Sequence, residues 1–435
     1  MLFALFVVLT FVLLVRPEDV FGQIVGGQSY LVVMCFTLPF AARRIVERLL
    51  NLRDDPISCC VLAYYALTVA STLFNVGSAV AISVATEFGK VVVAYFVGLA
   101  ALGPPRAFLK YLNVFPMLIA GVTLIGLLQY HEFIDNPAVA QCIQNDVDEN
   151  GEPISYVRLC SCGVFNDPND LCLALAVGLA LCAYHLVERS SILMAILSSI
   201  LVPCFLYALI LTKSRGGLLA VAAMISSLFV SRFGSRRALP LAIASVFGLL
   251  VLAGGGRQTS IDTSSGTAQG RIQIWADGLA EWRTSPLIGI GHGQFGERVQ
   301  IVAHNAYLHG FVESGYLGGT FFLGIFIVAI IGIARTPRID DDETTPEEEA
   351  VNRSRPFIVA AVVGYCVGMY GVSRNYVIPT YLMAALANSC LFSSHPVSER
   401  TWFVMNVAMV RRLALVGALT LAALFTFVKV FVNYG

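Results

Sequence analysis

Two cations interrupt an apolar run near the middle of the chain. Residues 209–221 read LILTKSRGGLLAV, so Lys213 and Arg215 have hydrophobic neighbours on both sides. A third cation, Arg271, opens the stretch RIQIWADGLAEW and precedes Trp275 by four residues. Guanidinium groups stay charged and form bidentate contacts with phosphate oxygens. These residues are therefore candidates for binding an anion.

A histidine and an asparagine open the stretch AHNAYLHGFVESGYLGG, residues 303–319. His304 and Asn305 stand directly before an apolar helical pattern, where a histidine most often caps the helix or lies at an interface. Histidine also suits the role of a base that takes a proton from a hydroxyl near neutral pH. His309 and Glu313 lie one helical turn apart on another face, and two such ligands alone are weak evidence for a metal site.

The amino-acid composition indicates which kind of fold must position these residues. The chain has 435 residues, of which 57% are hydrophobic and 13% are charged, and its mean hydropathy is +0.76. A soluble domain contains about 25% charged residues, so the sequence predicts an all-α polytopic membrane protein. The net charge is zero, which gives no general attraction to nucleic acid.

Apolar stretches long enough to cross a bilayer recur along the whole sequence, and we expect about 12–13 transmembrane helices. The expected spans are residues 1–15, 20–42, 57–74, 79–102, 112–130, 171–187, 192–211, 216–230, 238–253, 306–334, 357–371, 376–393 and 413–433. The first stretch lacks a basic segment and a small-residue cleavage site, and further spans follow it. We therefore interpret it as a membrane helix and not as a signal peptide.

Lysine and arginine are divided unevenly between the two sets of loops. One set contains 17 of them and the other contains nine, although the second set is longer in total. The positive-inside rule assigns the first set to the cytoplasm. Lys213, Arg215 and Arg271 belong to the opposite, outer set, where topology gives no reason for cations. We therefore expect their ligand at the outer face.

Two outer loops are large, residues 131–170 and residues 254–303. The second contains RIQIWADGLAEW, whose apolar residues form one helical stripe: Ile272, Trp275, Leu279 and Trp282. We expect a short helix in the outer membrane interface with Arg271 in its first turn, where a cation opposes the helix dipole unless an anion binds there. The alternative is that Arg271 snorkels and stacks on Trp275.

The same loop contains GHGQFG, residues 291–296, which matches the pattern GxGxxG. Neither a strand before it nor a long helix after it is expected, so we interpret these glycines as tight turns and not as a dinucleotide site. In the first outer loop, Cys142 is followed by Cys160 and Cys162. In an oxidising compartment, one disulfide between Cys142 and either of the other two is expected.

Four segments in this order resemble the O-antigen ligase family, which includes O-antigen and exopolysaccharide polymerases and protein O-oligosaccharyltransferases. They are FNDPNDLCLAL at the start of a span, KSRGG between two spans, GRIQIWADGLAEWRTSPLIGIGHGQF in the outer loop and AHNAYLHGFVESGYLG where the chain re-enters the membrane. The resemblance is strongest over about residues 160–334. It implies a membrane glycosyltransferase (GT-C-like) architecture of about a dozen helices with a large, partly helical outer loop over the active site.

The resemblance also implies the reaction, in which a glycan passes from undecaprenyl diphosphate to an acceptor hydroxyl. Arg215 and Arg271 would bind the diphosphate and His304 would be the catalytic residue, with no metal and no cofactor. Two guanidinium groups can neutralise the charge that builds on the leaving group. They would also disfavour the imidazolium form of His304 and so keep it competent as a base. A single displacement of this kind inverts the anomeric carbon.

Three more residues are expected to assist: Lys213 in diphosphate binding, and Asn305 and Trp275 in support of the site. For Lys213, as for Asp167, Asn169 and Asp170 near the start of the span at 171, a structural role is the simpler interpretation. The partners expected are a polyprenyl-diphosphate-linked glycan, an acceptor glycolipid, glycan or protein, and the lipid bilayer. The acidic, cysteine-bearing first outer loop departs from the family and leaves the acceptor open.

The expected organisation has four parts: N-terminal helices and the first outer loop at 1–170, a ligase-like core at 171–334, an acidic cytoplasmic linker at 335–356, and C-terminal helices at 357–435. The expected location is the bacterial inner membrane, with the site facing the periplasm or the exterior. Polymerases and protein O-oligosaccharyltransferases share this chemistry and remain alternatives. A transporter or flippase, with the outer cations along its pathway, is the alternative from another class.

Overall fold

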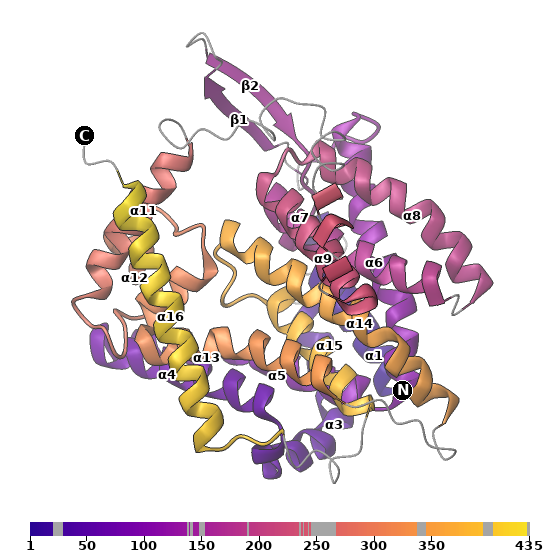
Figure 1. Ribbon diagram of the computed structural model, residues 1–435, viewed down its shortest axis with the longest axis horizontal. Helices are drawn as coiled ribbons and strands as arrows, with labels where there is room; N and C mark the ends of the chain where they lie inside the picture. Colours follow the sequence, from indigo (N-terminus) through magenta and orange to yellow (C-terminus); the bar gives the residue numbers. More distant parts are fainter. Residues whose placement is uncertain are drawn as a thin grey trace. The chain divides into compact units, whose positions relative to one another are not determined.

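The computed structural model describes residues 1–20, 29–136, 139, 142–147, 153–188, 191–234, 236–237, 239–241, 243–244, 267–336, 345–394 and 403–432 (Figure 1). Its α-helices are α1 (Leu2–Val15), α2 (Pro17–Val20), α3 (Ser29–Leu50), α4 (Pro56–Asn75), α5 (Ser78–Leu102), α6 (Pro105–Tyr130), α7 (Pro168–Glu188), α8 (Ile192–Leu211), α9 (Arg215–Phe233), α11 (Thr267–Trp282), α12 (Gln294–Val299), α13 (Ala306–Arg335), α14 (Pro346–Gly368), α15 (Ile378–Ser394) and α16 (Val407–Phe431). Short 3-10 helices are η1 (Leu52–Asp54), η2 (Gly163–Phe165) and η4 (Met369–Gly371). Strands β1 (Cys142–Val147) and β2 (Pro153–Arg158) form an antiparallel hairpin that pairs Cys142 with Arg158.

Nine of the described helices are long and apolar enough to cross a membrane. They are α3, α4, α5, α6, α7, α8, α9, α13 and α16, and two shorter apolar helices are α1 and α15. The predicted all-α polytopic membrane protein is therefore confirmed. The expected span 357–371 falls largely on the second half of α14. The expected span 238–253, the start of the outer loop at 254–266 and residues 337–344 of the expected linker lie largely or wholly outside the described residues.

Side-chain caps explain where several helices begin. The first turn of α14 has a capping box, in which Glu348 N donates to Thr345 Oγ1 at 3.3 Å and Thr345 N donates to Glu348 Oε2 at 3.0 Å. Because Pro346 then occupies the first helical position, the helix begins inside the stretch 335–356 that was expected to be a solvated linker. At α16, Asn406 Oδ1 accepts from Met409 N at 2.9 Å in the same way.

The helices group into two compact units. The first unit contains Met1–Arg43, Ala100–Ile261 and Thr336–Gly368, and the second contains Arg44–Leu99, Asp262–Arg335 and Met369–Gly435. In the first unit α7 is the central helix, since it packs against α6, α8, α9 and α14 and most of its residues are buried. Small residues permit this packing. A Cβ atom at Gly217 of α9 would lie 2.4 Å from the sulfur of Cys172 in α7, so the start of α9 lies directly against α7.

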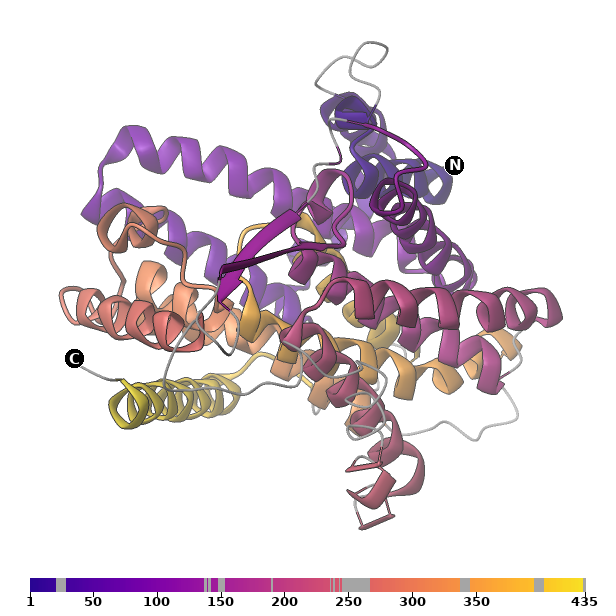
Figure 2. The same ribbon diagram turned by 90° about the horizontal axis from the view of Figure 1, so that it is seen from above.

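In the second unit α13 is the central helix, and α4, α11, α15 and α16 pack against it. Figure 2 shows α16 beside α11, in agreement with their contacts. The helix α13 is broken at Gly315, whose φ is 69° and ψ is −175°. The loop before α12 supplies the missing partners, because Tyr316 N donates to Pro286 O at 2.8 Å and Gly291 N donates to Glu313 O at 3.0 Å.

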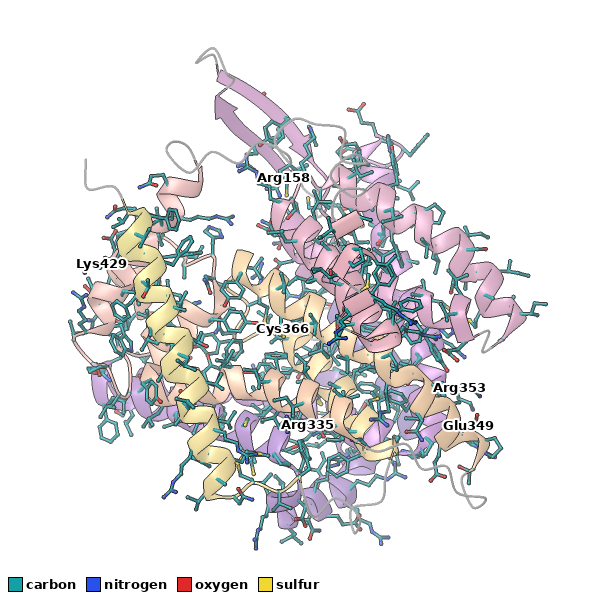
Figure 3. The ribbon with its side chains drawn as sticks, viewed as in Figure 1. Arg158, Arg335, Glu349, Arg353, Cys366 and Lys429 are labelled. Carbon is teal, nitrogen blue, oxygen red and sulfur yellow. The ribbon has the colours of Figure 1, made fainter. Side chains whose placement is uncertain are left out.

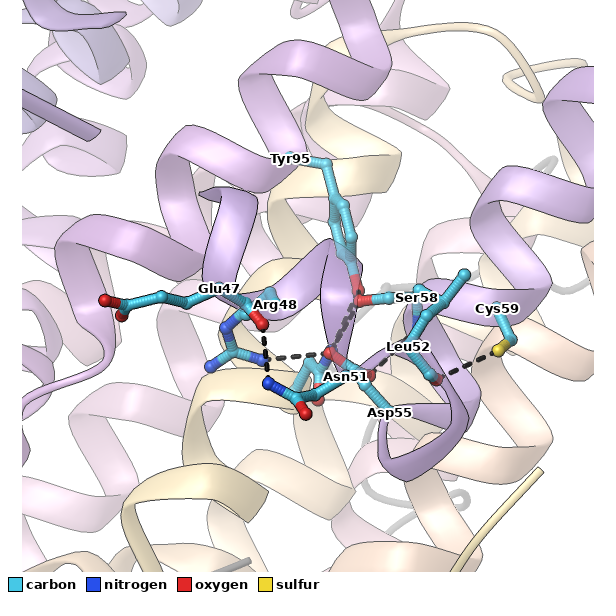
Figure 4. Close-up of polar contacts among 9 residues, drawn as sticks. Glu47, Arg48, Asn51, Leu52, Asp55, Ser58, Cys59 and Tyr95 are labelled. Atoms are coloured by element: carbon cyan, nitrogen blue, oxygen red, sulfur yellow. Dashed lines mark hydrogen bonds and ion pairs between the residues drawn. The ribbon is translucent and has the colours of Figure 1, made fainter. Parts of the chain in front are cut away.

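A buried polar cluster joins four elements of the second unit around Asp55 (Figure 4). The Asp55 carboxylate accepts from Ser58 N at 3.1 Å, which caps α4, and from Arg48 Nη1 at 2.9 Å. Asn388 of α15 donates to the same carboxylate and to the Tyr95 hydroxyl, both at 2.8 Å. Since Asp55 is 2% exposed, its charge is balanced by these donors and not by water.

Candidate functional site

The turn between α8 and α9 presents Lys213 and Arg215. Ser214 is the N-cap of α9, because its hydroxyl accepts from Gly217 N at 3.1 Å. Arg215 is consequently the first residue of the helix. Lys213 has a φ of 49°, in the left-handed region that side-chain-bearing residues rarely adopt. The backbone of the turn is therefore fixed before Ser214 by the conformation of Lys213 and after it by the hydrogen bond from Gly217.

Arg158, at the end of β2 (labelled in Figure 3), forms hydrogen bonds that fix this turn. Its Nε donates to the carbonyl of the buried residue Thr212 at 2.8 Å, and its Nη2 donates to Asn169 Oδ1 at 3.2 Å. The same Asn169 oxygen accepts from the Ser214 hydroxyl at 2.8 Å. A guanidinium group thus fixes the carbonyl before Lys213 and the amide that orients the cap of α9.

The hairpin also contacts Lys213 itself. The Lys213 ammonium lies 4.7 Å from the centre of the Tyr156 ring, which is a cation–π distance. Asp167 Oδ1 accepts from the backbone N–H of Asn169 at 2.7 Å and from its side-chain amide at 2.9 Å. The expected structural role of Asp167 and Asn169 thus has a geometric counterpart, since both orient groups that meet the α9 cap. Arg158 is one of the nine cations in the loops predicted to lie outside, but no pattern in the sequence predicts these hydrogen bonds, because they depend on the hairpin.

The helix predicted over RIQIWADGLAEW is present as α11. It begins at Thr267, so Arg271 is its fifth residue and not part of its first turn. The expectation that Arg271 acts together with the helix N-terminus is therefore wrong. The apolar stripe packs on protein, because Ile272 and Leu279 are buried and Trp282 contacts the ring of Phe425 in α16 at 5.5 Å.

Trp275 links α11 to the segment that carries His304. Its indole Nε1 donates to the carbonyl of Ala303 at 2.8 Å. Asn305 follows and caps α13, since its Oδ1 accepts from Tyr307 N at 3.0 Å and from Leu308 N at 3.1 Å. His304 lies between these two anchors and has a φ of 49°. Its imidazole is partly exposed, so it is held in a strained backbone conformation and remains accessible.

Asn305 has a second feature that bears on ligand binding. The residue is buried, and its Nδ2 has no acceptor among the described residues. A buried amide donor without a partner costs about 1–3 kcal/mol. The cost would be offset if a ligand oxygen accepted from it beside His304.

The pair expected at His309 and Glu313 is present, with His309 Nε2 at 3.0 Å from Glu313 Oε1. Glu313 also accepts from Phe295 N at 3.3 Å, so its carboxylate joins α13 to α12. Within the described residues no group of three histidine, cysteine or acidic side chains could hold a metal ion. Nearby, burial lowers the pKa of His292 below its usual range, although Glu313 opposes the shift. Glu313 thus connects α12 and the turn before it to α13.

The glycines of GHGQFG adopt the tight turns that were predicted. Gly291 and Gly293 have φ values of 101° and 81°. The expected disulfide is not formed, because all eleven cysteines are free thiols. Cys142 and Cys160 share a hydrogen bond, which raises the pKa of Cys142 and lowers that of Cys160. The Cys142 thiol also donates to Asn166 O at 3.2 Å.

The structure thus brings Trp275, His304 and Asn305 together in the second unit, where Arg271 lies one turn from Trp275 on α11. Lys213 and Arg215 lie beside one cap in the first unit. These features define a multi-pass membrane protein whose candidate site residues lie on α11 and where α9 and α13 begin.

Comparison with protein families gives a match over part of the chain. The model of the family described as O-Antigen ligase matches residues 200–323. This supports the O-antigen ligase family, the one that the four motifs indicate, over α9, α11, α12 and parts of α8 and α13. The match includes every candidate site residue, from Lys213 to Asn305, and leaves Arg158 outside. No curated protein matches the chain.

Proposed function

We propose that the protein transfers a glycan from a polyprenyl diphosphate, of the undecaprenyl type, to an acceptor hydroxyl at the outer face of a bacterial inner membrane. The family match supports an O-antigen ligase-like glycan transferase in general. The observation that carries the finer proposal is the His304 turn. The backbone of His304 is left-handed, its imidazole is accessible, and hydrogen bonds fix its neighbours Ala303 and Asn305. Strain of this kind persists where the surroundings fix a residue for a task.

In the proposed reaction His304 takes the proton of the acceptor hydroxyl. The oxygen then attacks the anomeric carbon, and the bond from that carbon to the phosphate oxygen breaks. Its electron pair leaves with the polyprenyl diphosphate. Arg215 and Arg271 would bind the diphosphate, with support from Lys213, and would disfavour the imidazolium form of His304 before the reaction. One displacement inverts the anomeric centre.

Asn305 and Trp275 would act as positioning residues in this scheme. Trp275 donates to the carbonyl before His304 and fixes it, and the side-chain oxygen Oδ1 of Asn305 fixes the first turn of α13. The unpartnered Nδ2 of Asn305 would donate to an oxygen of donor or acceptor.

The test is to incubate purified protein with a lipid-linked oligosaccharide and several acceptors (lipid A core, a polysaccharide end and a serine-containing peptide) and to weigh the products. The acceptor that gains mass separates ligase, polymerase and protein glycosylation. We expect Arg215→Lys to lose most activity because a point charge does not replace the planar fork. His304→Ala should insert correctly and form no product. Lipid that is translocated without transfer would refute the proposal and indicate a flippase.

A further inference from the structure

A cavity lies between the last turns of α13 and the first turns of α16, at the opposite end of α13 from His304. Its volume is about 450 Å³, within the roughly 300–1,000 Å³ that small-molecule sites occupy. Arg335 and Arg412 line it together with apolar side chains. Both helices belong to the second unit.

The apolar walls run along one face of each helix. On α13 the lining residues Ile327, Ile331 and Arg335 recur every four residues, so one stripe passes from apolar to cationic. This stripe extends about 12 Å along the axis, from the helical rise of about 1.5 Å per residue. On α16 the wall is formed by Leu413 and Val416, which follow Arg412.

Among the described residues no acidic side chain lines this cavity. Within the described part of the chain, neither Arg335 nor Arg412 forms an ion pair or a hydrogen bond, although Arg48, Arg232 and Arg298 do. Two guanidinium groups that line one cavity repel each other. A bound phosphate group would offset that repulsion and accept hydrogen bonds from both.

We propose that this cavity binds an anionic glycerophospholipid, with its phosphate between Arg335 and Arg412 and the upper part of one acyl chain along Ile327, Ile331 and Val416. A free phosphate would satisfy the arginines and leave the apolar walls in water. A lipid satisfies both, because its charged and apolar parts follow each other in the same order as the stripe on α13. The lysine and arginine count assigns this end of the helices to the cytoplasm, the side where basic pockets between helices bind anionic lipid head groups.

The test is a binding titration of the full-length protein, purified in a neutral detergent and followed by native mass spectrometry. The probes are phosphatidylglycerol, phosphatidylethanolamine with the same acyl chains, and glycerol 3-phosphate. We expect phosphatidylglycerol to bind at least 10-fold more tightly than phosphatidylethanolamine and glycerol 3-phosphate not to displace it. Equal binding of the two lipids would overturn the proposal, and displacement by glycerol 3-phosphate would indicate a phosphate site instead.

Neighbouring residues provide matched variants. Arg412 lines the cavity and Arg411 does not, so Arg412→Gln should weaken phosphatidylglycerol binding about 5-fold and Arg411→Gln by less than about 2-fold. The Arg335→Gln and Arg412→Gln double variant should weaken it about 30-fold, at about 1 kcal/mol for each arginine near an anionic surface. Equal effects of Arg411→Gln and Arg412→Gln would overturn the proposal, since they would reflect general charge.

A second pair of variants tests the acyl chain without changing charge. Val416→Trp should fill the cavity and weaken lipid binding, whereas Leu415→Trp, at a residue 61% exposed beside it, should leave binding unchanged. An unaltered unfolding temperature in each variant separates a lost site from a lost fold. Lipid binding that survives Val416→Trp in a folded protein would refute the placement of the chain.

Discussion

Replacement of Arg158 by Gln should weaken donor binding in the proposed reaction without preventing the protein from folding. Its three donors reach Thr212 O at 2.8 Å, Gln144 Oε1 at 2.9 Å and Asn169 Oδ1 at 3.2 Å. Glutamine is shorter and uncharged and can replace at most one of them. A hydrogen bond to a charged group contributes about 1.5–3 kcal/mol.

The consequence of that loss falls on the turn that carries Arg215. If the free energy of one such bond is lost from the arrangement that binds the diphosphate, kcat/KM falls about 10- to 100-fold, since 1.36 kcal/mol corresponds to tenfold. The loss should appear as a higher KM for the lipid-linked donor, with the KM for the acceptor unchanged. A merely structural role would lower the amount of active enzyme and leave both KM values as they are.

The assay is the transfer reaction with each substrate varied in turn, together with the unfolding temperature of each variant. Arg298→Gln is the matched control, because it removes another arginine of the loops predicted to lie outside. Arg298 pairs with Glu281 at 3.0 Å and, within the described residues, forms no ion pair or hydrogen bond with a candidate site residue. Arg158→Lys should recover part of the donor affinity, since an ammonium group can still reach one oxygen. An unchanged donor KM in folded Arg158→Gln, or an equal rise in Arg298→Gln, would refute the reasoning.

Three further predictions concern the second unit. Gly315→Ala should destabilise the protein by more than about 3 kcal/mol, because the new Cβ would lie 2.3 Å from the Leu287 carbonyl oxygen and Gly315 has a φ of 69°. Thermal unfolding measures this, and Gly121→Ala is the control because nothing lies within 4 Å of a Cβ there. The pKa of His292 is lowered in the folded state, so the unfolded state binds more protons and stability should fall as the pH decreases below about 6.5. His292→Phe should make this loss of stability smaller between pH 7.5 and pH 5 in unfolding scans. An unchanged dependence on pH would contradict this. His304→Gly should be about 1 kcal/mol more stable than His304→Ala, because glycine adopts the left-handed conformation without strain; equal unfolding temperatures would contradict the strain.

The sequence predicted the features of this protein that depend on local pattern. The apolar spans, the helix over RIQIWADGLAEW and the helix start directly after His304 and Asn305 all follow from periodicity and residue type at short range. The residue that caps this helix is Asn305 and not the histidine, for which capping was the predicted alternative. Helix α11 starts four residues before the predicted helix, since TAQG before Arg271 has no large apolar residue that would extend the pattern. The same limit applied to α14, whose start depends on the reciprocal cap of Thr345 and Glu348 inside an acidic run.

The features that escaped prediction depend on contacts between segments far apart in the chain. Arg158 reaches Thr212 across 54 residues, and no spacing rule connects a strand end to a helix end at that distance. The break in α13 has the same origin, because Gly315 reads as one more glycine in a helix. Its conformation is fixed by Pro286 and Leu287, whose carbonyls accept the N–H groups that the break releases.

Lys213 of the first unit and His304 of the second unit share a local geometry. Each has a φ of 49° and each directly precedes the residue that caps a helix, Ser214 before α9 and Asn305 before α13. A residue with a side chain in the left-handed region costs about 1–3 kcal/mol, so the two together cost about 2–6 kcal/mol of a typical stability of about 5–15 kcal/mol. Glycine would remove that cost at both positions. That a cation and an imidazole occupy them argues that the side chains themselves are needed where each helix begins, which is the position that the proposed transfer assigns to diphosphate binding and to proton removal.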